Sequence, residues 1–78
     1  MKRTYFVVNW STLDIRGGFR AYSHIFSGSD ILANEILAKV FARKKAAKNR
    51  VYYVTLCRFD AVRINDKHET TTATKIEF

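Results

Sequence analysis

A single helical segment, Ser27–Arg50, most constrains what this chain can fold into. Helix-favouring Ala, Leu, Lys and Arg fill the segment, and its larger apolar residues recur on one side at about 100° per residue. Ser27 followed by Asp30 resembles a short capping box, with Ser29 and Asp30 as competing caps. The sequence therefore predicts one helix that starts at this group of cap residues.

The two predicted sides of the helix differ in composition. The side expected to pack on the rest of the protein carries Leu32, Ala33, Ile36, Leu37, Val40 and Ala47. The side expected to face away carries Asn34, Glu35, Ala38, Ala42 and Lys45. We therefore expect Ile36 and Val40 in the core, together with strand residues Phe6, Val8 and Val54.

Four segments rich in β-branched and aromatic residues flank the helix and predict strands. They are Thr4–Trp10, Phe19–Phe26, Val51–Ile64 and Glu69–Phe78. Turn-forming residues separate each pair: Gly17 and Gly18 end the connection 11–18, and a polar turn spans 65–68. The predicted fold is α+β: a four-stranded antiparallel sheet with a single helix packed on one face, in the order ββαββ.

The third predicted strand contains an irregular pattern. Tyr52, Val54 and Leu56 alternate as expected, but the charged Arg58 and Asp60 then fall on that same side. A change of side midway through a strand indicates a β-bulge, which we expect near Cys57.

The charge of the chain points to an anionic partner. Its 78 residues, expected to form a single domain over 1–78, carry a net charge of +7. Such a charge attracts nucleic acid or an acidic protein surface. A domain this small also has a small core, which leaves room for a homodimer that covers further apolar surface.

The positive charge is concentrated in residues 39–50, which hold six bases and no acid. The predicted binding residues are Lys39, Arg43, Lys44, Lys45, Lys48 and Arg50, with Arg58 extending them onto the sheet. Such bases release counterions from phosphates. The alternative interpretation is a solvated helix end, where the dipole and the exposed carbonyls favour cations.

A second constellation interleaves arginines with aromatic residues. Arg16, Arg20, Arg58 and Arg63 are interleaved in the sequence with Tyr22, Tyr52, Tyr53 and Phe59. Aromatic rings on a sheet can stack with bases. A small sheet also needs large residues for its core, and for most of these rings we favour that interpretation.

The sequence predicts no enzyme, no metal site and no cofactor. His24 and His68 have no spacing typical of metal ligands, and Cys57 has no acidic neighbour in sequence. Because a single cysteine cannot form an internal disulfide, we expect a cytoplasmic protein. No apolar run reaches the roughly 18 residues of a membrane span, and the basic start precedes too short an apolar block for a secretory signal.

Two classes of function remain. The first is a nucleic-acid-binding module that uses the basic C-terminal half of the helix. The second follows from a resemblance: a hairpin, a capped helix and returning strands in under 80 residues look like small bacteriophage accessory proteins. That resemblance implies a chain that binds and inhibits a host protein or nucleoprotein machine, as inhibitors of RNA polymerase and anti-CRISPR proteins do. It rests on no motif and assigns no residue a role.

Overall fold

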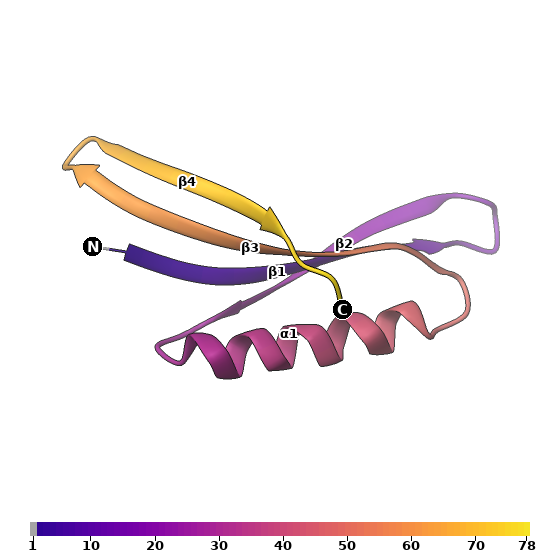
Figure 1. The fold of residues 1–78 in the computed structure, drawn as a ribbon. Coiled ribbons are helices and arrows are strands. Elements are labelled where there is room, and N and C mark those ends of the chain that lie inside the picture. The colour runs from indigo at the N-terminus through magenta and orange to yellow at the C-terminus, as the bar shows by residue number, and fades with distance from the viewer. Residues whose placement is uncertain (1) are drawn as a thin grey trace.

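The computed structural model describes residues 2–78 and shows the predicted α+β fold (Figure 1). Its elements are β1 (Lys2–Leu13), β2 (Phe19–Ser27), α1 (Ile31–Ala46), β3 (Val51–Asn65) and β4 (His68–Lys75). The strands form one antiparallel sheet in the order β2-β1-β3-β4, and α1 lies across one face of it. The molecule is elongated, with principal extents of 48, 26 and 17 Å.

The helix is shorter than predicted at both ends. Ser27 belongs to β2, so it cannot cap α1; Asp30 is the N-cap, and its Oδ1 accepts a hydrogen bond from the Ala33 N–H at 3.0 Å. At the other end, Ala47 is the C-cap, and Arg50 has a positive φ of 63° that no helix accommodates. The extended geometry of β2 and the reversal before β3 therefore limit the helix.

The predicted packing face of α1 is wrong. Ala38 and Ala42 are fully buried against the sheet, whereas Leu32, Ile36, Leu37 and Val40 are exposed. The reason is steric: the sheet presents large side chains, and small residues on the helix allow the two backbones to approach closely. Leu32, Ile36, Leu37 and Val40 are called the outer face of α1 below.

The core lies between the sheet and the alanine side of α1. Phe6, Val8 and Leu56 are completely buried, which confirms the prediction for Phe6 and Val8. Val54 is partly buried and packs against them. Ile36 and Val40, also expected in the core, lie instead on the outer face.

Aromatic rings extend this core toward β2. Phe41 of α1 contacts Trp10, His24 and Phe26, with ring centroids 5.0–5.5 Å apart. Beyond β4, the backbone N–H of Ile76 donates to the carbonyl of Leu56, and the C-terminal tail runs toward α1 (Figure 1). Large residues from the strands and the tail thus fill the space that the alanines leave.

The predicted bulge exists, but it is not at Cys57. Cys57 pairs regularly with Val7, and the register between β1 and β3 shifts only between Asn9 and Ser11. There, β3 contains an additional residue, and Tyr53 adopts a positive φ of 57°. No change of face is needed at Cys57, because the charged residues beyond it are paired with each other on the helix side of the sheet.

The sheet face opposite α1 has no covering layer within residues 2–78 (Figure 1). Tyr5 and Phe59 stack on it with ring centroids 5.2 Å apart, and the Arg3 guanidinium lies 5.4 Å from the Tyr5 ring centroid. Over the same residues, the one helix is neither long nor apolar enough to cross a membrane.

Candidate functional site

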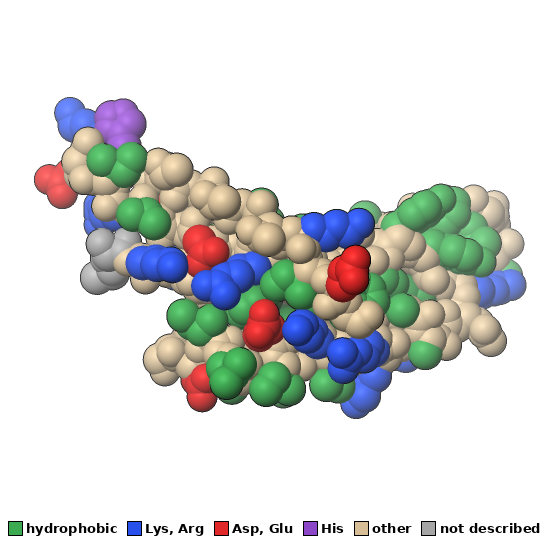
Figure 2. Space-filling view, in the orientation of Figure 1, with side chains coloured by type: hydrophobic (Ala, Val, Ile, Leu, Met, Phe, Trp, Pro, Cys, Tyr) green, Lys and Arg blue, Asp and Glu red, His purple; other side chains and the backbone are tan. Residues whose placement is uncertain are grey.

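The predicted basic residues divide among three elements. Four lie on α1 (Lys39, Arg43, Lys44 and Lys45), two lie in the connection that follows it (Lys48 and Arg50), and Arg58 lies in β3. Figure 2 shows basic side chains gathered over the C-terminal part of α1. The site is therefore a helix end together with its exit loop, rather than the helix alone.

Most of these positive charges are not neutralised by the protein. Among residues 2–78, the ion pairs involve Lys2, Arg3 and Arg58, and none involves a base between residues 39 and 50. Lys45 is the base in this run that contacts aromatic rings: its Nζ lies 4.5 Å from the Trp10 ring centroid and 5.2 Å from that of Phe41. Its ammonium is thus engaged in cation–π contacts.

The sequence predicts that Arg58 extends the basic group onto the sheet, but in the structure Arg58 is paired with Asp60. Its Nε donates to Asp60 Oδ2 at 3.0 Å, and its Nη2 donates to Oδ1 at 3.3 Å. Thr4 donates to the same carboxylate at 2.7 Å, and this hydrogen bond and those from Arg58 hold the pKa of Asp60 below its ordinary value of 3.8. Arg58 is therefore part of a structural polar network on the helix side of the sheet.

A cluster of exposed rings, Phe19, Tyr52 and Tyr53, lies next to the basic connection. Phe19 lies 5.9 Å from both Tyr52 and Tyr53, and the two tyrosines lie 6.4 Å apart, measured between ring centroids. Their exposed fractions are 56, 43 and 74% in the order Phe19, Tyr52 and Tyr53. Rings this exposed contribute little to a core, so the expectation that most of the interleaved rings fill it does not hold for Tyr52 and Tyr53.

Strand pairing brings the rings and the bases together. Leu13 pairs with Phe19 across the first hairpin, and the Leu13 N–H donates to the Arg50 carbonyl at 3.0 Å. The connection that carries Lys48 and Arg50 therefore lies beside the tip of the β1–β2 hairpin. The aromatic–basic end is the name used below for Phe19, Lys48, Arg50, Tyr52 and Tyr53.

The backbone at this end is strained. Arg50 and Tyr53 are the two non-glycine residues with positive φ in the part of the chain that the structure describes. At Tyr53, glycine would fit the left-handed bulge position at lower conformational cost. Strain that supports an exposed aromatic ring is a reason to suspect a functional role there.

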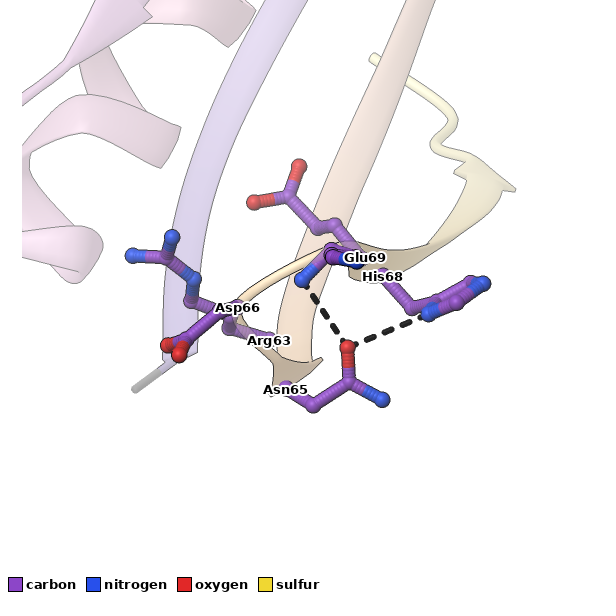
Figure 3. Close-up of a pocket in the computed structure, with 6 residues that line it drawn as sticks. Arg63, Asn65, Asp66, His68 and Glu69 are labelled. Atoms are coloured by element: carbon purple, nitrogen blue, oxygen red, sulfur yellow. Dashed lines mark hydrogen bonds between the residues drawn. The ribbon is translucent and has the colours of Figure 1, made fainter.

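The β3–β4 turn forms a shallow hollow of a different kind (Figure 3). Asn65 Oδ1 accepts from the Lys67 N–H at 2.9 Å and lies 3.1 Å from His68 Nδ1. Figure 3 shows side chains of both charge signs around it, including Arg63 and Glu69. These contacts are those of a turn stabilised by an asparagine, and they explain the position of His68 without a catalytic role.

The other two candidate reactive residues, His24 and Cys57, lie among residues of the sheet and helix that account for their positions. His24 packs between Phe26 and Phe41, with ring centroids 4.6 and 5.0 Å away. Cys57 is a free, half-buried thiol within β3. Across residues 2–78, no three His, Cys, Asp or Glu side chains come together in a way that could hold a metal ion.

Comparison with known proteins found no relative: no family model, no curated protein and no solved structure matches this chain. Its function must therefore be inferred from its own residues.

Proposed function

We propose that this chain is a non-enzymatic nucleic-acid-binding module that holds single-stranded segments at its aromatic–basic end. The observation that carries the proposal is the position of three exposed, clustered rings beside unpaired bases. Proteins that bind single strands combine a positive surface that follows the phosphates with rings on which bases stack. The proposal involves no chemical step.

The bases and the rings have separate tasks in this proposal. Arg43, Lys44, Lys48 and Arg50 contact phosphates and release their counterions, which makes the affinity dependent on salt. Tyr53, the most exposed ring of the cluster, stacks on a base; such a contact contributes about 1–3 kcal/mol. Lys45 remains on Trp10 and contributes long-range attraction rather than a phosphate contact.

The test is a matched pair of triple variants measured with labelled oligonucleotides. One variant replaces Arg43, Lys44 and Lys48 by glutamine. The control replaces three exposed bases on the β3–β4 hairpin, Arg63, Lys67 and Lys75, and so changes the net charge equally. We expect the first variant to lose more affinity than the control. Its plot of log affinity against log salt concentration should also become less steep, by roughly 0.7 in slope for each lost phosphate contact to a single strand.

Two outcomes contradict the proposal. If both triple variants bind equally well, only net charge matters and the aromatic–basic end is not a site. If duplex and single strand bind with equal affinity and Tyr53→Ala changes neither, base stacking plays no part.

A pull-down from cell lysate, with and without nuclease, tests the other class of function. Partners that disappear after nuclease treatment support nucleic-acid binding. A single protein that stays bound supports instead an accessory protein that inhibits a larger machine.

A further inference from the structure

The outer face of α1 is an unusual surface for a chain with so small a core. Leu32, Ile36, Leu37 and Val40 are 67, 55, 55 and 39% exposed, whereas Ala38 and Ala42 on the opposite side of the same helix are fully buried. Figure 2 shows hydrophobic side chains along the side of this helix that faces away from the sheet. Contiguous exposed aliphatic residues on one face mark an interaction site, and their spacing suits a second helix.

We infer that this face binds the same face of a second copy of the chain, with the two helices antiparallel. A two-fold axis makes such a contact self-complementary: when one residue of the first copy meets another of the second, the reverse pair also forms, and only residues near the axis meet their own counterparts. Ile36 and Leu37 lie near the middle of the helix and of the exposed aliphatic group, so they lie at the centre of the contact.

The charges of α1 favour the antiparallel arrangement. Its last turn holds Arg43, Lys44 and Lys45, whereas its N-cap is an acid, Asp30. Parallel helices would bring the basic ends together, which is unfavourable. Antiparallel helices bring basic ends to acidic N-caps, where opposite charges attract.

One ion pair follows from helix geometry. Asp30 and Lys44 lie on opposite sides of the midpoint between Ile36 and Leu37. Counted along the helix axis, their distances from that midpoint are nearly equal. At about 100° per residue they also share one flank of the outer face. Lys44 of one copy therefore lies within about one residue of Asp30 of the other, and Asp30 uses only Oδ1 to cap its own helix.

The first test is the mass in solution as a function of concentration. The variant Ile36→Gln with Leu37→Gln removes the aliphatic centre without changing charge or helix propensity strongly. The control, Ile15→Gln with Ile64→Gln, makes the same change at two exposed residues off the helix. We expect the native chain and the control to reach twice the monomer mass and the outer-face variant to stay monomeric, all with the same circular dichroism.

The second test distinguishes orientation by oxidative cross-linking in a Cys57→Ser background. Antiparallel packing places Leu37→Cys beside its counterpart, whereas two Lys44→Cys residues lie about 20 Å apart. We therefore expect a rapid cross-link at position 37 and none at position 44; equal cross-linking at both positions would overturn the antiparallel arrangement.

The dimer itself is overturned if the native chain stays monomeric at its highest soluble concentration. It is equally overturned if a monomeric chain binds phosphatidylglycerol vesicles through the outer face. Neither result bears on the aromatic–basic end itself, because Phe19, Lys48, Arg50, Tyr52 and Tyr53 lie outside the outer face. Lys44, which the dimer pairs with Asp30, is the one base that both proposals share.

Discussion

At the scale of single residues, the ionisation of the Asp60 carboxylate is tied to the fold. It accepts from Thr4 and Arg58, and Lys2 Nζ lies 3.8 Å away. Thr4 is buried, whereas the Asp60 side chain is 22% exposed. Solvent therefore weakens the contribution of these charges to the stability of the folded chain. The network lowers the pKa of Asp60, so the carboxylate stays ionised to a lower pH than an ordinary aspartate does.

We predict that this network produces part of the acid sensitivity of the protein. Because the pKa of Asp60 is lower in the folded chain than its ordinary value of 3.8, the stabilisation is complete above that value. It is lost as the pH falls through the lower folded value. Urea denaturation across the acid range should show that Asp60→Asn reduces this loss, and Asp66→Asn, in the exposed turn, should not.

Tyr53 presents a conflict between stability and the proposed function. A left-handed backbone costs a non-glycine residue about 1–2 kcal/mol, whereas glycine adds about 0.5–1 kcal/mol of unfolded-state entropy. Tyr53→Gly should therefore leave the free energy of unfolding unchanged or raise it by up to about 1.5 kcal/mol, while oligonucleotide affinity falls. Tyr53→Phe, which keeps the ring, serves as the control; a variant with glycine that binds as tightly would remove Tyr53 from the site.

At the scale of elements, α1 is a helix with two apolar sides of different size. Apart from Phe41, which packs against the aromatic residues of the sheet, its small residues face the sheet and its large aliphatic residues face outward, which reverses the usual arrangement of a surface helix. The strands supply the large core residues instead.

Substitutions on the two sides of α1 should therefore have opposite effects from those expected of an ordinary amphipathic helix. Ala38→Leu should destabilise the fold by about 1–3 kcal/mol, because it overpacks a closed interface. Leu37→Ala should cost well under the 2–5 kcal/mol expected for Leu56→Ala, measured by denaturation at concentrations where the chain is monomeric. A large loss at Leu37 under those conditions would mean that the outer face is buried within one chain.

At the scale of the whole molecule, the two proposed surfaces lie on different parts of an elongated body. The aromatic–basic end lies at the tip of the β1–β2 hairpin. The outer face of α1 lies on the other side of the molecule from the uncovered face of the sheet (Figure 1). An antiparallel dimer therefore carries two aromatic–basic ends, one toward each end of the helix pair.

This arrangement predicts avidity. The charge-neutral variant Ile36→Gln with Leu37→Gln should bind a short oligonucleotide like the native chain, because one end suffices. It should bind a long one more weakly by a factor of about 100 or more, since linked sites gain effective concentration. Equal affinities for the long oligonucleotide would show that the two ends do not act together.

The sequence alone determined the order of elements, the fold class and the position of the positive charge. Local properties decide these features: alternation in the strands, helix propensity between Asp30 and Ala47, and the absence of acids from 39 to 50. Strand boundaries were predicted within a few residues for the same reason. Among the core residues, Phe6 and Val8 were predictable because they belong to the central strand of the sheet.

Only the tertiary structure decided which side of α1 is buried, where β3 bulges and which rings are exposed. Each of these features depends on contacts between residues that are far apart in the sequence. Ala38 and Ala42 pack inward because the facing strands are bulky, and Arg58 stays on the helix side because Asp60, which Thr4 also holds, accepts its hydrogen bonds. The sequence contains both partners of every such contact, but its local periodicity does not say that they meet.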